Sequence, residues 1–204
     1  MSRPATDHPT HRITGGQMTD TQITDAADRA RAAIARHTRL VPDFPSPGIA
    51  FKDLTPVLAD AEGLSAVTTA LAQAGGDIDL VAGIDARGFL LGGAIALQLG
   101  VGVLAIRKAG KLPPPVRSAD YDLEYGTASL EVPADGVDLH GRRVLVVDDV
   151  LATGGTLNAA IGLLEAAGAV VPTAVVVMEI DGLPGRDAVE SAHRDLVLTS
   201  LAAG

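Results

Sequence analysis

Two adjacent carboxylates, Asp148 and Asp149, precede a short segment of small and hydroxylated residues at 152–156. The apolar run at 144–147 before them is typical of a buried parallel strand, and the pattern at 156–167 predicts a helix. In open α/β sheets, ligands bind at the carboxyl ends of the strands. Two carboxylates at such a place are suited to accept hydrogen bonds from a vicinal diol, such as the 2- and 3-hydroxyls of ribose.

The segment after the two carboxylates can bind a phosphate. Its small residues allow several backbone N–H groups to surround one anion, and the following helix adds the partial positive charge of its N-terminus. A turn in which the acids only cap the helix is the simpler alternative, but it does not explain two acids, two threonines and two glycines in one short stretch. The predicted phosphate loop consists of Ala152, Thr153, Gly154, Gly155 and Thr156.

Strands and helices alternate around this segment, an order that favours an α/β fold with a parallel sheet. An Ala- and Arg-rich helix is expected from residue 25 to the Val41-Pro42 pair, and a long loop interrupts the alternation at 108–125. Further strands are expected at 79–84, 101–107, 127–132, 143–147, 173–180 and 195–198, and further helices at 63–74, 88–99 and 156–167.

The composition excludes several classes of protein. The chain has 204 residues, and a polar, disordered leader at 1–20 is expected before a single domain at 21–204. The absence of cysteine rules out disulfides, thiolate metal sites and cysteine nucleophiles, and it suits a reducing cytoplasm. A formal net charge of -9 argues against sequence-independent binding of nucleic acid, and no apolar run is long enough to cross a membrane.

Residues 144–156 resemble the signature of the phosphoribosyltransferase family, which is an apolar strand, two acids and a Thr-Gly-Gly-Thr phosphate loop. The resemblance continues as far as Arg186, and it implies a Rossmann-like α/β fold. In that fold a mostly parallel central sheet is flanked by helices, with a small hood at about 43–53 and a flexible lid loop at about 108–125. Four other segments are similar to the adenine-specific members of the family, in the same order along the chain: 44–53, 83–89, 107–113 and 121–126.

The resemblance implies transfer of a 5-phosphoribosyl group from phosphoribosyl pyrophosphate to adenine, which forms AMP and pyrophosphate. It also implies Mg2+ carried with that substrate, with no dedicated protein metal site, and a homodimer. A 6-oxopurine acceptor is the nearest alternative, but its site should direct a donor, often a Lys, at O6, and the sequence has no spare Lys outside the hood and lid. A regulator that binds nucleic acid would need an added domain or a basic face, which this acidic sequence does not offer.

Two groups of residues would bind pyrophosphate. Asp85, Ala86 and Arg87 follow a predicted strand, and their exposed N–H groups and single guanidinium would clamp a diphosphate. The carbonyl of Arg87 would also accept a hydrogen bond from the amino group of adenine, by the same resemblance. A surface ion pair between Arg87 and Asp85 is the structural alternative. The second group leads into the lid, where cations would neutralise the leaving group, and consists of Arg107, Lys108 and Lys111.

The resemblance places adenine between the side chains of Phe51 and Ile180, while the backbone at Ile49 and Ala50 reads the edge of the base. Packing in the core is the alternative for both side chains. That alternative is stronger for Ile180, because it ends a strand of valines.

The end of the lid supplies the last candidates. Glu124 would handle the N7 proton of the purine, and Tyr125 would contact phosphate or pack in the closed lid. Pro114 stands where the family often has Gly, and it would stiffen the lid. The implied catalytic set is Glu124, Asp148, Asp149, Arg107 and Lys111.

Overall fold

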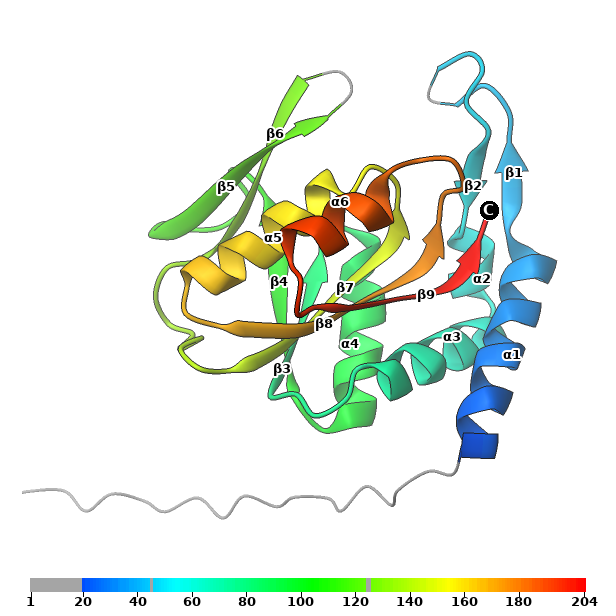
Figure 1. Cartoon of the computed structure of the whole chain (residues 1–204), viewed down its shortest axis with the longest axis horizontal. Coiled ribbons are helices and arrows are strands. Elements are labelled where there is room, and N and C mark those ends of the chain that lie inside the picture. Colours follow the sequence, from blue (N-terminus) through cyan, green and yellow to red (C-terminus); the bar gives the residue numbers. More distant parts are fainter. Residues whose placement is uncertain (1–19, 45, 124–125) are drawn as a thin grey trace, which may run out of the picture.

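The computed structural model describes residues 20–44, 46–123 and 126–204. Helices cover both faces of a central sheet in this part of the chain (Figure 1). The leader expected at 1–20 lies outside the described residues except for Asp20, where the first helix begins. The helices are α1 (Asp20–His37), α2 (Thr55–Ala59), α3 (Ala61–Ala74), α4 (Arg87–Leu99), α5 (Gly155–Ala166) and α6 (Gly185–Ala192). The strands are β1 (Arg39–Val41), β2 (Phe51–Asp53), β3 (Leu80–Ile84), β4 (Gly102–Lys108), β5 (Val116–Leu123), β6 (Gly126–Pro133), β7 (Arg143–Leu151), β8 (Val170–Glu179) and β9 (Val197–Ala203).

The central sheet has seven strands in the order β5-β6-β4-β3-β7-β8-β9. Neighbouring strands from β4 to β9 are parallel, whereas β5 and β6 form an antiparallel hairpin on the β4 edge. This mostly parallel sheet with helices on both faces confirms the predicted fold class.

The core consists of two apolar layers, one on each face of the sheet. Side chains alternate along a strand, so Leu80 and Ala82 of β3 pack on the side of α5 and α6, whereas Val81 packs on the side of α1 to α4. Strand β7 divides in the same way, with Val146 on the first side and Val147 on the second. Both faces are therefore buried, which explains why these strands are continuous apolar runs.

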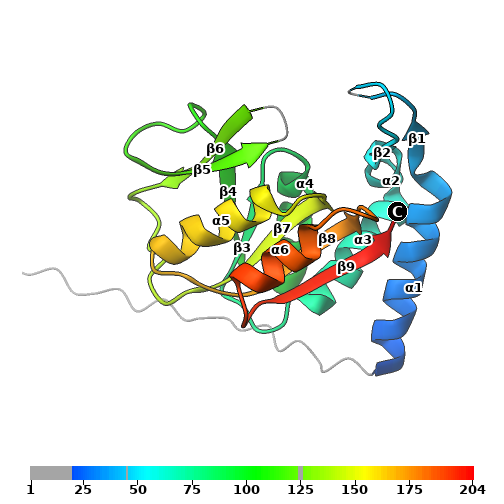
Figure 2. The same cartoon turned by 45° about the horizontal axis from the view of Figure 1, so that its top comes forward.

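Two hairpins rise above the edge of the sheet where the parallel strands end. The β5–β6 hairpin stands over one part of this edge and the β1–β2 hairpin over another (Figures 1 and 2). The loops after β3, β7 and β8 lie at the same edge, because the carboxyl ends of parallel strands meet there. The fold thus brings together segments that are far apart in the sequence.

The expected end of the first helix at Val41-Pro42 is wrong. Helix α1 ends at His37, and β1 then pairs with β2 in antiparallel register, with Arg39 opposite Asp53. Arg39 also forms an ion pair of 2.9 Å with the buried Asp53 carboxylate. The helical pattern could not show this strand, because its partner lies ten residues further along the chain.

The expectation of a loop throughout 108–125 is also wrong. Strand β5 lies within that range and pairs with β6 continuously, from Val116 opposite Pro133 to Leu123 opposite Gly126. Pairing with β6 stabilises β5 as a strand. The Pro-rich stretch before Val116 indicates a loop, so the local sequence does not predict this strand.

Smaller differences concern the ends of two strands, since β7 continues through both aspartates to Leu151 and the last strand is β9 and not 195–198. Three other elements, β2, α2 and α6, were not expected. No helix in the described ranges is long and apolar enough to span a membrane.

Candidate active site

The two carboxylates lie near the end of β7, beside the ends of β3 and β8. Asp149 is 6% exposed, and its backbone N–H donates to Asp148 Oδ1 at 2.8 Å. The chain turns at Gly154 and enters α5 at Gly155. Gly154 has a φ of 85°, and a Cβ there would lie 2.8 Å from the carbonyl oxygen of Gly185, so the turn requires glycine.

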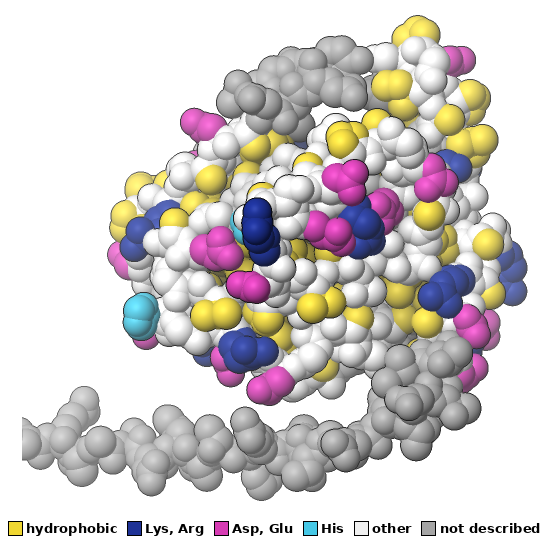
Figure 3. Space-filling model, in the orientation of Figure 1, with side chains coloured by type: hydrophobic (Ala, Val, Ile, Leu, Met, Phe, Trp, Pro, Cys, Tyr) yellow, Lys and Arg dark blue, Asp and Glu magenta, His cyan; other side chains and the backbone are white. Residues whose placement is uncertain are grey.

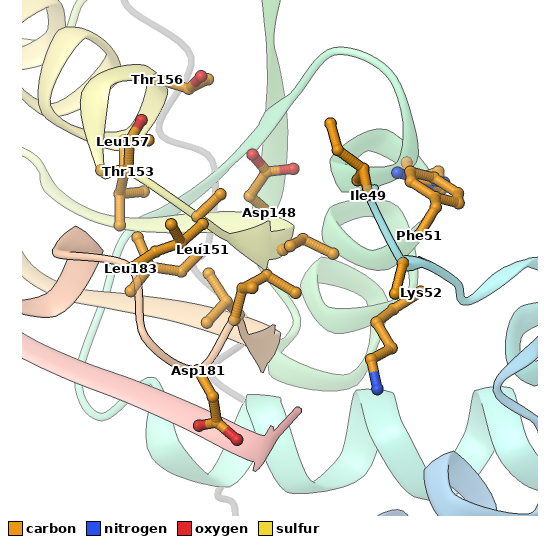
Figure 4. A pocket seen from close by; sticks show the side chains of 17 residues that line it. Ile49, Phe51, Lys52, Asp148, Leu151, Thr153, Thr156, Leu157, Asp181 and Leu183 are labelled. Carbon is orange, nitrogen blue, oxygen red and sulfur yellow. The ribbon is translucent and has the colours of Figure 1, made fainter. Parts of the chain in front are cut away.

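A cavity of about 640 Å³ lies between this turn and the β1–β2 hairpin, and we call it the hood cavity. Such a volume suits a small-molecule ligand. In Figure 4, Thr153 and Thr156 lie on one side, Ile49 and Phe51 lie on the other, and Asp148 is between them. The predicted site residues that line this cavity are Ile49, Ala50, Phe51, Arg87, Asp148, Ala152, Thr153, Gly154, Thr156 and Ile180.

A second cavity, of about 570 Å³, is lined by residues at the end of β3, the start of α4 and the β5–β6 hairpin, and we call it the Asp85 cavity. Arg87, Asp148 and Thr156 line both cavities, so the two adjoin. A ligand with several polar groups can therefore extend from one into the other. The predicted site residues that line the Asp85 cavity are Asp85, Ala86, Arg87, Lys108, Asp148, Asp149 and Thr156.

Arg87 is paired with the second aspartate of β7. Its Nε lies 2.6 Å from Asp149 Oδ2, and its Cζ lies 6.0 Å from the centre of the Phe51 ring. The contact with Asp149 is an ion pair without the geometry of a directed hydrogen bond. The alternative pairing with Asp85 is not found, because Arg107 Nε binds Asp85 Oδ2 at 3.1 Å.

The aspartate pair holds an unsatisfied acceptor. Asp149 Oδ2 is buried and has no hydrogen-bond donor within the described residues. Burial, together with the charge of Asp149, raises the pKa of Asp148, and the guanidinium of Arg87 opposes this rise. A ligand with hydroxyl groups would supply the missing donor to Asp149 Oδ2, and a cation would favour the ionised form of Asp148.

Helix α4 begins beside the Asp85 cavity. Its first residue is Arg87, and the peptide bond between Asp85 and Ala86 is cis. A Cβ at Gly88 would lie 2.6 Å from the carbonyl oxygen of Val147, so glycine allows the helix to begin this close to β7. The partial positive charge of the helix N-terminus therefore adds to that of Arg87 next to the cavity.

The structure does not bring every predicted residue to the two cavities. Among the described residues, Gly155, Arg107 and Lys111 line neither. Arg107 instead forms an ion pair with Asp85, which lines the Asp85 cavity, and its Cζ lies 5.5 Å from the centre of the Phe89 ring. Glu124 and Tyr125 lie outside the described residues, so their predicted roles stay predictions.

Several cavity residues were missed by sequence reasoning. Tyr121 of β5 lines the Asp85 cavity, and Lys52, Asp181 and Leu183 line the hood cavity. Tyr121 could have been found only by recognising β5 as a strand, because alternation then fixes which side chains share a face. Asp181 is the second residue after the end of β8, near the position where an open parallel sheet binds ligands.

The surface over α5, α6 and β9 has mixed charge. Figure 3 shows Lys and Arg side chains there interspersed with Asp and Glu side chains. Nucleic-acid binding uses a continuous basic surface, so this face does not favour such a partner.

Known proteins resemble the chain over most of its length. The family model of the phosphoribosyl transferase domain matches residues 51–197. An adenine phosphoribosyltransferase of Mycobacteroides abscessus is 65% identical over 162 residues, which are 79% of this chain and 92% of that protein.

Solved structures agree with this match. The adenine phosphoribosyltransferase of Thermoanaerobacter pseudethanolicus superposes with a TM-score of 0.78 at 43% identity, over 85% of this chain and 99% of that one. The enzyme of Saccharomyces cerevisiae, solved in complex with an imino-altritol bisphosphate and adenine, gives a TM-score of 0.77 at 35% identity, over 86% of this chain and 99% of that one. The fold, the phosphate loop and these similarities lead to one conclusion, which is that the chain belongs to the phosphoribosyl transferase family and has adenine phosphoribosyltransferases as its relatives.

Proposed function

We propose that this protein transfers the 5-phosphoribosyl group of phosphoribosyl pyrophosphate to adenine. The bond between the anomeric carbon and pyrophosphate breaks, a bond from that carbon to N9 of adenine forms, and the products are AMP and pyrophosphate. The observation that carries this proposal is that Arg87, Asp148 and Thr156 line both adjoining cavities. A ribose held at these shared residues would have its base on one side and its leaving group on the other.

The phosphate loop and the aspartates would hold the ribose 5-phosphate. Backbone N–H groups at 152–156 and the N-terminus of α5 suit the phosphate. The buried acceptor at Asp149 Oδ2 and the neighbouring Asp148 suit the two ribose hydroxyls. A ribose hydroxyl would thereby give the buried Asp149 Oδ2 the hydrogen-bond donor that it lacks within the described residues.

The hood cavity would hold adenine against the Phe51 ring, with Ile180 on the other side and the backbone of Ile49 and Ala50 at its edge. The complex of the yeast relative with adenine supports this choice of base. Lys52 is the hood residue that could donate to the O6 of an oxopurine, but its side chain extends away from Phe51 in Figure 4, which favours adenine.

The remaining residues would promote departure of pyrophosphate. Arg87 and Lys108 line the Asp85 cavity, where their charges would neutralise the leaving group, and Arg107 would orient Asp85. Lys111 would join them from the neighbouring turn. Glu124 would exchange a proton with N7 of the purine, and Tyr125 would cover the bound phosphates, as the resemblance implies.

Mg2+ fits this arrangement as a companion of the substrate. The described residues hold no group of three or more His, Asp or Glu side chains placed to bind a metal, whereas the aspartate pair offers one unsatisfied buried oxygen. We therefore propose that Mg2+ arrives with phosphoribosyl pyrophosphate, next to Asp148 and Asp149. When bound, it would supply positive charge to the diphosphate.

The first experiment incubates the protein with phosphoribosyl pyrophosphate and Mg2+ and, in separate reactions, with adenine, hypoxanthine, guanine or xanthine. Nucleotide products are then separated by chromatography. AMP from adenine alone is the expected result. A nucleotide formed from an oxopurine would retain the phosphate loop but contradict the assignment of the hood, and no product from any base would overturn the proposed reaction.

Phe51→Ala is expected to raise the KM for adenine by about 10- to 100-fold, because stacking of one base on an aromatic ring contributes about 1 to 3 kcal/mol. The KM for phosphoribosyl pyrophosphate should change little, as measured by steady-state kinetics with each substrate varied in turn. Phe44→Leu is the matched control, since the Phe44 ring lies 5.1 Å from that of Phe51 but is 51% exposed. Equal effects of the two variants on adenine would contradict the stacking role.

We also propose a homodimer in the cytoplasm. Leu90 and Leu97 lie two turns apart on the same face of α4, with exposed fractions of 62% and 85%, and Val103 of neighbouring β4 is 52% exposed. Exposed apolar side chains of this size are typical of an interface between subunits.

Leu97→Glu is expected to convert the dimer to a monomer, because the new charge would be buried without a partner at the interface. Size-exclusion chromatography with light scattering measures the mass. Val197→Glu serves as the control, since Val197 is 60% exposed on the edge strand β9. A monomeric wild type, or a dimer that survives the Leu97 substitution, would contradict the proposed interface.

A further inference from the structure

Two of the proposed pyrophosphate-binding cations lie at the end of β4 and in the short turn after it. Lys108 is the last residue of β4 and lines the Asp85 cavity, and Lys111 follows three residues later. Gly110 between them has a φ of 76°, a conformation that side chains other than glycine rarely adopt. This turn begins directly after Lys108, which is paired with Leu130 of β6, so the contacts of β6 with this region help to place Lys108 at the cavity.

Strand β6 holds the turn at two points. The N–H of Ala109 donates to the carbonyl of Ser129 at 2.9 Å, and the N–H of Gly110 donates to Glu131 Oε2 at 3.0 Å. Glu131 is 8% exposed, so its carboxylate is one of the few buried charged groups in the described residues. A buried carboxylate that accepts a backbone hydrogen bond is costly to leave unpaired, which makes this contact a strong constraint.

Glu131 also lies next to Arg107, the residue that binds Asp85 at the cavity. It lies directly opposite Arg107 in the β4–β6 ladder, and Arg107 binds the Asp85 carboxylate that lines the cavity. One residue of β6 is therefore next to both the strand that orients Asp85 and the turn that follows Lys108.

We propose that Glu131 is a positioning residue for pyrophosphate. Its carboxylate oxygen holds the N–H of Gly110 and so keeps Lys108 at the Asp85 cavity, without contacting the substrate itself. This inference rests on the proposed function for its effect on the reaction. Its effect on binding of free pyrophosphate does not require adenine to be the acceptor.

Two conservative substitutions separate the effect of side-chain length at position 131 from the effect of its charge. Glu131→Gln keeps an acceptor oxygen at the same distance from Gly110 but removes the charge, whereas Glu131→Asp keeps the charge and shortens the side chain by one methylene. Pyrophosphate binding to the whole protein with Mg2+ present is measured by calorimetry, and the KM values for both substrates by kinetics. Glu62→Asp, on an exposed position of α3, is the matched control.

Glu131→Gln should bind pyrophosphate within about threefold of the wild type, because the hydrogen bond is retained. Glu131→Asp should bind it about tenfold more weakly and raise the KM for phosphoribosyl pyrophosphate by a similar factor, with the KM for adenine unchanged. The reverse order of the two variants, or equal changes in both KM values, would overturn the proposal.

A double-mutant cycle gives an independent readout. If Glu131 acts by positioning Lys108, then Glu131→Asp should hardly weaken pyrophosphate binding further once Lys108→Ala is present, because the side chain that Glu131 positions is already missing. Fully additive losses would show that Glu131 acts by another route. A wild type that binds pyrophosphate but forms no AMP would overturn the proposed function while leaving this inference intact.

Discussion

Arg87→Ala is expected to lower kcat/KM for phosphoribosyl pyrophosphate by about two orders of magnitude, the usual loss when one preorganised charge-stabilising group is removed. Arg87 lines both cavities and faces Asp149 at 2.6 Å. Its loss would remove a cation from the leaving group and would leave two neighbouring carboxylates without their counter-charge. Steady-state kinetics with adenine held at saturation measures the effect.

Arg87→Lys separates charge from geometry. An ammonium keeps the charge but lacks the planar fork of the guanidinium, so an intermediate loss is expected. Arg142→Ala is the control, because Arg142 is exposed and borders neither cavity in the described part of the chain. Activity of Arg87→Ala within threefold of the wild type would remove Arg87 from the pyrophosphate site.

Asp149→Asn is expected to lower kcat/KM by about 100-fold and to leave the fold almost as stable as the wild type. The buried Oδ2 of Asp149 is the acceptor proposed for a ribose hydroxyl, and an amide in its place offers one acceptor fewer. Stability should change little, since the substitution also relieves repulsion from Asp148. Kinetics and a thermal melt on the same preparation test both parts, and unchanged kinetics would contradict the proposed role.

Asp148→Asn should instead stabilise the free protein at pH 7. The pKa of Asp148 is raised by burial and by the charge of Asp149, so its carboxyl favours the folded state only while it is protonated. That contribution is present below the unfolded pKa of about 3.9 and is lost as the pH rises through the folded pKa.

The expected gain for Asp148→Asn is a Tm about 2 to 4 °C higher at pH 7, or about 1 kcal/mol for a chain of this length. The difference from the wild type should shrink towards zero as the pH falls below about 3.9, because the Asp148 carboxyl is then protonated in both the folded and the unfolded chain. Melts at several pH values measure it. A variant that is less stable at pH 7 would show that the charged Asp148 contributes favourably to the free protein.

The phosphate loop could be predicted from the sequence because its chemistry is local. Two acids, two threonines and two glycines follow one another at the end of an apolar strand, and each residue acts near its own place in the chain. The strands β3, β7 and β8 were predictable for a related reason, since strands buried on both faces are continuous apolar runs.

The sequence by itself thus determined the α/β fold and the types of residue that would bind a sugar phosphate and a base. Only the tertiary structure decided the partners: Arg87 with Asp149, Arg107 with Asp85, and Glu131 with the turn at Gly110. It also decided that β1 and β5 are strands. These features depend on contacts between residues far apart in the chain, and periodicity and propensity report only on neighbours, so the pattern of one segment could not reveal them.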